Sequence, residues 1–203
     1  VFDKKKAGET SSAENVTRVD SYHKFSYVSK LWFMNVTPFG TIRETFYSRN
    51  RWERRYVGRH VLGGGVNVFA RFHRIYDFST NFLGLDINKV RHIIVPNAEY
   101  FHNHQPTVDK SNLYQMDEID SIEKQNGVRL SLENKLQTKR GSGENMYSVD
   151  LMRFIVSTDY LFRMEKDKFA MQDGNKFTDV DFNMELWPYN WLYADGELSI
   201  RPK

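Results

Sequence analysis

The residues best suited to chemistry are the histidines, and two of them stand close together. His102 and His104 are separated by one residue, and Glu99 lies shortly before them. Imidazole and carboxylate groups in such a cluster are the ligands of many zinc sites. The histidine pair runs directly into a long polar segment, however, which favours ordinary surface histidines. The sequence therefore predicts neither a metal site nor a cofactor.

Two further features resemble elements of active sites, namely a run of glycines and a pair of aspartates. Gly63, Gly64 and Gly65 are consecutive, but neither a helix nor a Lys-Ser/Thr pair follows them, as a phosphate-binding loop requires. Inside a strand, glycine marks a bend or a close approach of two backbones. Asp179 and Asp181 share one side of a strand, which suits a hydrated surface better than a general acid–base pair. With no cysteine to act as a nucleophile and no Ser-His-Asp spacing, we expect no enzyme.

The elements that carry these residues show a two-residue period. Successive side chains of a strand point to opposite faces, and residues 128–139 separate by this rule into an apolar set and a charged set. About eight segments show the alternation: residues 24–33, 41–51, 60–76, 90–100, 128–139, 150–162, 178–188 and 192–201. No segment has the 3.6-residue stripe of an amphipathic helix. The sequence therefore predicts an all-β chain.

The strands are long, and the connections between them alternate in length. Each predicted strand has on the order of ten residues, where ordinary strands have about five or six and a tilted membrane crossing needs about 9–11. Three connections are short, three are longer, and aromatic residues gather beside them. The short ones are residues 37–40, 140–145 and 188–190, the long polar ones 102–127 and 164–175, and the intermediate one 77–89. Outer-membrane barrels have short turns on one side, long loops on the other and aromatic girdles at both interfaces.

This pattern predicts an antiparallel up-and-down meander that forms part of the wall of a large transmembrane outer-membrane β-barrel. We expect residues 1–17 to be a polar N-terminal segment and residues 18–203 to be a partial barrel wall. The lipid-facing candidates are Leu130, Leu132, Leu136, Phe154, Phe182, Met184 and Leu186. The lumen-facing candidates are Arg129, Glu133, Lys135, Lys139, Arg153, Asp159, Asp181 and Glu185.

Two runs of sequence carry a family resemblance. Residues 90–100 read VRHIIVPNAEY, and residues 132–140 read LENKLQTKR. They resemble two strands of the lipopolysaccharide-assembly outer-membrane protein (LptD, or OstA) family, in the family's order and with a polar loop between them. Residues 177–191 are similar to the part of the family that follows. The resemblance covers most of residues 59–203 and is looser before them.

The resemblance implies a place in a transport machine. The family's protein is a very large barrel, plugged by a lipoprotein subunit and preceded by a periplasmic jellyroll domain. It receives lipopolysaccharide from periplasmic bridge proteins and inserts it into the outer leaflet of the outer membrane of Gram-negative bacteria. The implied partners are thus lipopolysaccharide, the plug, the bridge proteins and outer-membrane lipid. This chain would be a mid-barrel piece without the jellyroll, the exit seam or the family's disulfide cysteines, so no seam residue can be assigned.

Two other readings remain open. A complete eight-strand barrel acting as an anchor or adhesin would fill its interior with the charged face, although the chain ends at Arg201-Pro202-Lys203 without a terminal aromatic. A soluble β-sandwich or lipocalin-like binder is disfavoured by the strand lengths. The net charge of +3 is too small to indicate nucleic-acid binding.

The fragment reading makes geometric predictions. The first and last strands do not pair with each other, and the sheet is an open, curved wall. The turns near Pro38 and Pro188 lie at one end of it, and the 102–127 loop lies at the other. The charged side chains of the concave face are exposed rather than packed as ion pairs.

Overall fold

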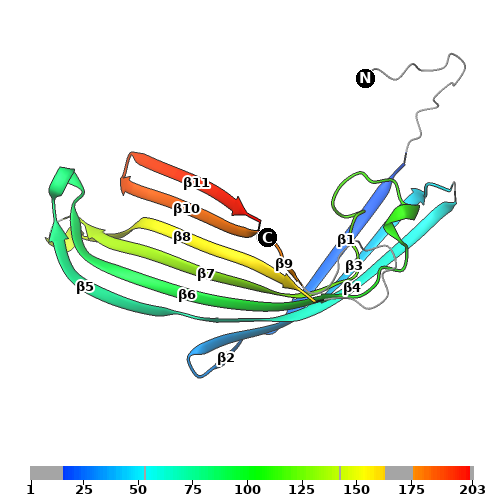
Figure 1. Ribbon diagram of the computed structural model, residues 1–203, viewed down its shortest axis with the longest axis horizontal. Coiled ribbons are helices and arrows are strands. Elements are labelled where there is room, and N and C mark those ends of the chain that lie inside the picture. The colour runs from blue at the N-terminus through cyan, green and yellow to red at the C-terminus, as the bar shows by residue number, and fades with distance from the viewer. Residues whose placement is uncertain (1–15, 53, 142, 163–175, 202–203) are drawn as a thin grey trace, which may run out of the picture.

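A computed structural model describes residues 16–52, 54–141, 143–162 and 176–201 as one antiparallel sheet (Figure 1). Its main strands follow the order of the chain, so each lies beside its sequence neighbours. The predicted all-β, up-and-down meander is therefore confirmed. The main strands are β1 (Arg18–Ser26), β3 (Met34–Arg49), β4 (Arg55–Ala70), β6 (Ile87–Asn103), β7 (Gln125–Arg140), β8 (Tyr147–Leu161), β10 (Val180–Tyr189) and β11 (Leu192–Ile200).

Three short strands prolong the main ones. These are β2 (Ser29–Leu31), which pairs with β3, β5 (Phe72–Thr80), which pairs with β6, and β9 (Lys176–Phe177), which pairs with β8. The described helices are the short 3-10 turns η1 (Phe82–Gly84), η2 (Lys110–Asn112) and η3 (Gly143–Asn145). None of the helices in these ranges is long and apolar enough to cross a membrane.

The sheet is open. Within the described residues β1 pairs only with β3, and β11 pairs only with β10. The ribbon accordingly forms a curved trough with separate first and last strands (Figure 1). The prediction that these two strands do not pair is confirmed. The predicted 164–175 loop and most of the polar 1–17 segment lie outside the described residues.

The prolines explain where the strands are interrupted. Pro38, predicted to form a turn, instead lies inside β3, and the chain turns at Trp32 and Phe33. Proline has no N–H to donate, and the register sets Pro38 opposite the gap between β1 and β2. Pro96 in β6 likewise faces the gap between β4 and β5. Pro188 lies at a register shift between β10 and β11. The turn predicted at Pro38 was wrong. A proline within a strand can interrupt the strand beside it, and its own local sequence then looks like that of a turn.

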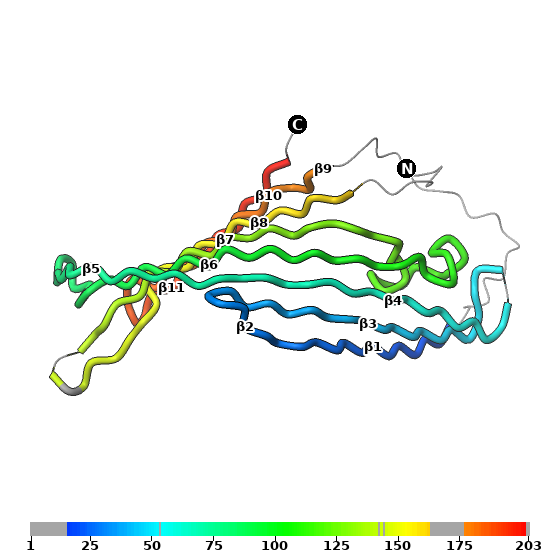
Figure 2. Tube along the Cα trace, turned by 90° about the horizontal axis from the view of Figure 1, so that it is seen from below, coloured from blue at the N-terminus to red at the C-terminus, as the bar shows by residue number. Residues whose placement is uncertain are grey.

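The connections alternate between the two ends of the sheet (Figure 2). The η1 connection, the η3 connection and the β10–β11 turn lie at one end, which we call the short-turn end, and the turn at Trp32 and Phe33 points the same way but lies short of that end. The β3–β4 turn and the long connection after β6 lie at the opposite end. The β10–β11 turn and the long β6–β7 loop therefore lie at opposite ends, as predicted.

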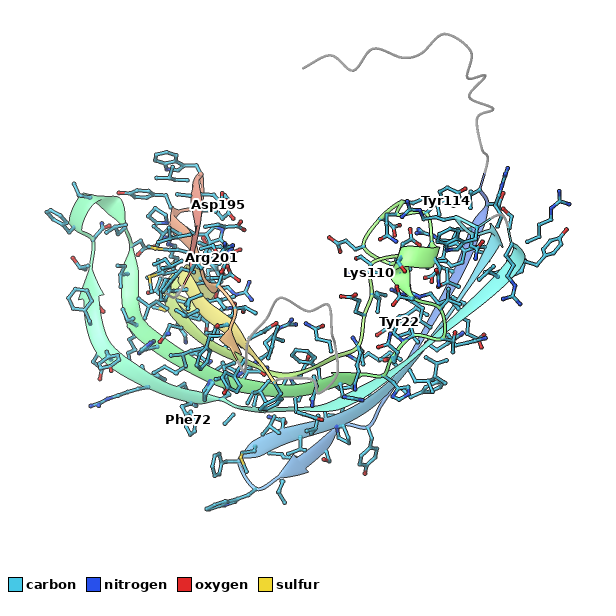
Figure 3. All side chains as sticks on the ribbon, turned by 45° about the vertical axis from the view of Figure 1, so that its right-hand side comes forward. Tyr22, Phe72, Lys110, Tyr114, Asp195 and Arg201 are labelled. Carbon is cyan, nitrogen blue, oxygen red and sulfur yellow. The ribbon has the colours of Figure 1, made fainter. Side chains whose placement is uncertain are left out.

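The register divides the side chains between a convex and a concave face. Residues directly opposite each other in neighbouring strands share a face. Phe72 is opposite Ile94, Ile94 is opposite Asn134, Asn134 is opposite Phe154, and Phe154 is opposite Met184. Phe72 points out from the convex side, while Lys110 stands over the concave side (Figure 3). The predicted apolar set therefore lies on the convex face and the charged set on the concave face.

The triple glycine allows two strands to approach closely. A Cβ atom on Gly65 would lie 2.0 Å from the carbonyl oxygen of Tyr100 in β6, and one on Gly63 would lie 2.5 Å from Oδ1 of Asn103. No side chain fits at Gly65, where the contact is with backbone, whereas at Gly63 the side chain of Asn103 would have to move. The prediction that these glycines mark a close backbone approach, rather than a phosphate loop, agrees with this geometry.

Candidate functional site

The long loop between β6 and β7 folds back over the concave face of β1, β3 and β4 (Figures 1 and 3). Leu113 of this loop is fully buried against Tyr47 of β3 and Val57 of β4, with Val108 packed beside them. This is the hydrophobic core cluster of the described residues, and elsewhere the sheet is a single layer. The loop is therefore part of the folded wall.

Arg59 of β4 holds both ends of the loop. Its side chain is only 1% exposed. Its Nε donates to the carbonyl oxygen of Val108 at 3.0 Å, and Nη1 donates to that of Ile119 at 2.8 Å. A third bond runs from Nη2 to the carbonyl oxygen of Ile122. A planar guanidinium with five N–H groups can hold three carbonyls at fixed positions, which fixes the loop at separate points.

Asp120 is the second anchor and is fully buried. Its carboxylate accepts hydrogen bonds from Tyr47 Oη at 2.6 Å, Arg18 Nη1 at 2.9 Å and the backbone N–H of Met116 at 2.8 Å. Arg18 also forms an ion pair with Asp117. We call Arg18, Tyr47, Arg59, Asp117 and Asp120 the loop clamp. It joins the loop to three strands through charged hydrogen bonds, which are stronger than neutral ones.

The clamp keeps both loop carboxylates ionised. Burial of Asp120 would by itself raise its pKa, but hydrogen bonds from Tyr47, Met116 and Arg18 outweigh burial and lower that pKa below its usual value. The hydrogen bond from Arg18 lowers the pKa of Asp117 to about 2. Both groups therefore carry negative charge opposite Arg18 at neutral pH.

Backbone bonds extend the attachment along the loop. The N–H of His104 donates to the carbonyl of Leu62 at 2.8 Å, and the N–H of Thr107 donates to that of His60 at 3.1 Å. Trp52 Nε1, in the β3–β4 turn, donates to Oδ1 of Asn112 at 2.9 Å. The loop thus begins by continuing the β4–β6 pairing and then meets the neighbouring turn.

Beyond the loop, the concave face carries cross-strand ion pairs. Nε and Nη2 of Arg129 donate to the two carboxylate oxygens of Asp159, at 2.8 and 2.9 Å. Lys135 lies 3.1 Å from Asp150. Arg153 lies 2.8 Å from Glu133 and 3.5 Å from Glu185. Asp181 accepts a bond from Ser199, and Lys139 is exposed.

The prediction of exposed, unpaired charges on this face was therefore wrong for most of these residues. Directly opposed side chains on antiparallel strands have Cβ atoms about 4.5–5.5 Å apart, so Arg129 meets Asp159 and Arg153 meets Glu185. The pairs Lys135–Asp150 and Arg153–Glu133 are not directly opposed, and their long side chains meet diagonally. The concave face nevertheless keeps these pairs in contact with solvent, since the Arg129 side chain is 55% exposed. It is a hydrated surface of alternating charge.

The convex face is apolar and exposed. Along β4 and β5 the side chains of this face run from Leu62 through Val66, Val68 and Ala70 to Phe72. Leu62 and Phe72 are about half exposed. The same face of β7 and β10 carries all the apolar candidates named from those strands. Of the large apolar side chains on this face, the exposed ones include Phe25, Phe46, Leu130, Leu132, Met184 and Leu198.

The loop clamp was not found from the sequence. The predicted strand began at residue 60, one residue after Arg59, and Asp117 and Asp120 fell in a segment interpreted only as polar loop. The histidine pair remains outside the clamp, with the rings of His102 and His104 6.5 Å apart. Within the described ranges no three His, Asp, Glu or Cys side chains lie close enough to hold a metal ion.

Comparison with known protein families, with curated proteins and with solved structures finds no match. The two faces of the sheet and the loop clamp are therefore the features that indicate a function.

Replacing Asp120 with Asn should release the loop. The buried carboxylate that accepts hydrogen bonds from Tyr47, Arg18 and Met116 would be lost, and weakening several such charged hydrogen bonds costs roughly 3 kcal/mol. We expect trypsin cleavage within residues 104–124 to accelerate about 100-fold at neutral pH, since ~1.4 kcal/mol corresponds to a factor of ten. The control is Glu123→Gln, which breaks the exposed pair with Lys110 and should change cleavage less than about fivefold. Equal cleavage of both variants would contradict the clamp.

Acid should release the same loop. A carboxylate with a lowered folded-state pKa stabilises the fold above its unfolded pKa, about 3.9 for Asp, and this stabilisation is lost as the pH falls through the folded value. The chain has no cysteine, so Glu118→Cys introduces a single thiol for a fluorophore. We expect this fluorophore to stay immobile down to about pH 4 and to gain rotational freedom as the pH falls toward 2. Mobility that first rises between pH 5 and 7 would contradict the assignment to Asp117 and Asp120.

Proposed function

We propose that this chain is part of the wall of a large outer-membrane β-barrel, with lipid against its convex face and water against its concave face. The observation that carries the proposal is the height of the apolar band. On the convex face of β4 and β5 it runs from Leu62 to Phe72, bounded by His60 and Arg74. At ~3.3 Å per residue this is about 33 Å along the strand. A strand tilt of about 40° reduces it to a height of about 25 Å, which is the lipid-facing band of such barrels.

The other features fit the same environment. Exposed apolar surface of this extent marks a membrane or protein contact rather than a free aqueous surface. A soluble sandwich would cover this face with a second sheet, whereas the described residues form one layer. Exposed aromatic residues stand beside turns on both sides of the apolar band: Trp32 and Trp191 toward the short-turn end, Trp52 and Tyr56 toward the other. Amphipathic rings at the two membrane interfaces are typical of barrels.

The open edges favour a fragment of a larger barrel over a complete small one. Unpaired backbone N–H and C=O groups in hydrocarbon cost several kcal/mol each. β1 and β11 do not pair with each other, as they would in a closed eight-strand barrel. We therefore propose that further strands of the parent protein complete both edges.

For the biological role, we propose lipopolysaccharide insertion into the outer leaflet of the Gram-negative outer membrane. Support comes from the resemblance of residues 90–100 and 132–140 to the LptD family. These runs lie on the paired strands β6 and β7, where Pro96 is opposite Leu132. The proposed partners are lipopolysaccharide, a lipoprotein plug and periplasmic bridge proteins. The concave face would border the plug and the passing saccharide, with the loop clamp holding the long loop against the wall over β1, β3 and β4.

Membrane placement is tested by two neighbouring substitutions in β7. Leu132→Arg puts a charge on the convex face, and should destabilise the chain in lipid vesicles by about 2–4 kcal/mol. Ser131→Arg puts the same charge on the concave face and should cost less than about 1 kcal/mol. Denaturant titration in vesicles measures both. The proposal would be contradicted if the chain is monodisperse in buffer without detergent. It would also be contradicted if Ser131→Arg destabilises the chain more than Leu132→Arg does.

The transport role is tested separately by photo-crosslinking in intact cells. A photoreactive residue replaces Ile155, which shares the concave face with Glu133, or Val156, which lies on the convex face. We expect a lipopolysaccharide adduct at position 155 that disappears when the periplasmic bridge is depleted. The adducts at position 156 should persist under that depletion. Lipid adducts at 156 with none at 155 would leave the membrane wall intact and contradict the transport role.

A further inference from the structure

The tip of the β2–β3 hairpin leaves the plane of the sheet on its convex side (Figure 1). The space between the tip and the sheet is a groove of about 670 Å³. Phe33 and Met34 line it from the tip, while Val68, Phe72, Ala98 and Leu132 line it from the sheet. Ala70, beneath the tip, is only 7% exposed, so the groove is partly roofed.

The chemistry of the groove fits a hydrocarbon chain. The convex-face side chains that line it are aliphatic or aromatic apart from Thr158. Asn97, Ser131 and Ser157 also border it, but they lie opposite one another in the row of residues that faces the concave side. The rings of Phe33 and Phe72, 6.0 Å apart, connect the tip to the sheet. The volume falls within the range of about 300–1,000 Å³ that is typical of small-ligand sites. Covering an apolar groove of this kind with a hydrocarbon chain is favourable.

The groove has a cation at one end. Arg74 follows Phe72 by two residues, shares its convex face and lies opposite His92. Its guanidinium is 5.2 Å from the ring centroid of Tyr76, and the residue is exposed. Guanidinium groups bind phosphate oxygens through paired N–H bonds. A ligand with an alkyl chain and an anionic phosphate would satisfy both parts.

We propose that this groove binds one acyl chain of an anionic phospholipid, with the phosphate against Arg74. The proposal depends on the proposed membrane placement of the convex face. Arg74 lies toward the short-turn end, which in outer-membrane barrels faces the periplasm. The lipid that meets this end is therefore a phospholipid of the inner leaflet, and the departure of the hairpin tip from the sheet creates its site.

Native mass spectrometry of the full chain in detergent, titrated with phosphatidylglycerol, tests the site. We expect one tightly retained lipid per chain. Ala98→Trp fills the groove and should weaken retention at least tenfold, while Ala194→Trp, on the same face of β11 outside the groove, should not. Arg74→Gln changes only an exposed side chain, so the fold is kept. It should remove most of the preference for phosphatidylglycerol over phosphatidylcholine, whereas Arg55→Gln at the opposite end should leave it unchanged.

Several results would overturn the lipid site. Equal retention by wild type and Ala98→Trp would exclude the groove, and an unchanged headgroup preference in Arg74→Gln would exclude the phosphate contact. If lipid A binds more tightly than phosphatidylglycerol, the occupant is not an inner-leaflet phospholipid. If Ala98→Trp changes the oligomeric state, the occupant is a second copy of the chain. A chain that enters vesicles but retains no lipid in the groove contradicts this inference alone. A chain that stays soluble without detergent contradicts the membrane wall as well.

Discussion

The register of the antiparallel pairing is the constraint on which the other features depend. Leu132 lies between Pro96 and Val156, so its side chain shares their convex face. A slip of one residue would bring Glu133 to that face and the apolar residues to the concave one. The ion pair between Arg129 and Asp159 also forms only in the observed register. The apolar band, the charged face and the close strand contacts thus result from a single choice of pairing.

Proline limits that pairing, and the groove lies where it does so. Pro38 and Pro96 each leave a neighbouring strand without a donor, and β1–β2 and β4–β5 are interrupted opposite them. Proline inside a sheet is otherwise confined to edges and bulges. The hairpin tip lies beyond the first interruption, and Phe72 begins the strand after the second. The site on the convex face is therefore a consequence of two missing hydrogen-bond donors.

The sequence predicted the strands and their faces because alternation is a local property, visible at residues such as Leu132 and Glu133 without knowledge of any partner. It misplaced the first turn, since the effect of Pro38 falls on a different strand. It missed the loop clamp for a related reason. Arg59 and Asp120 act together only after the long loop has folded onto the concave face, and no pattern within either segment shows that contact.

The clamp makes the two open edges unequal. Arg18 belongs to the edge strand β1, and its bonds to Asp117 and Asp120 tie that strand to the loop as well as to β3. The other edge strand, β11, pairs with β10 alone, and its described side chains are all exposed. An edge strand held from one side only opens more easily, since fewer contacts must break. The β1 edge is thus held more firmly than the β11 edge, which is attached through β10 alone.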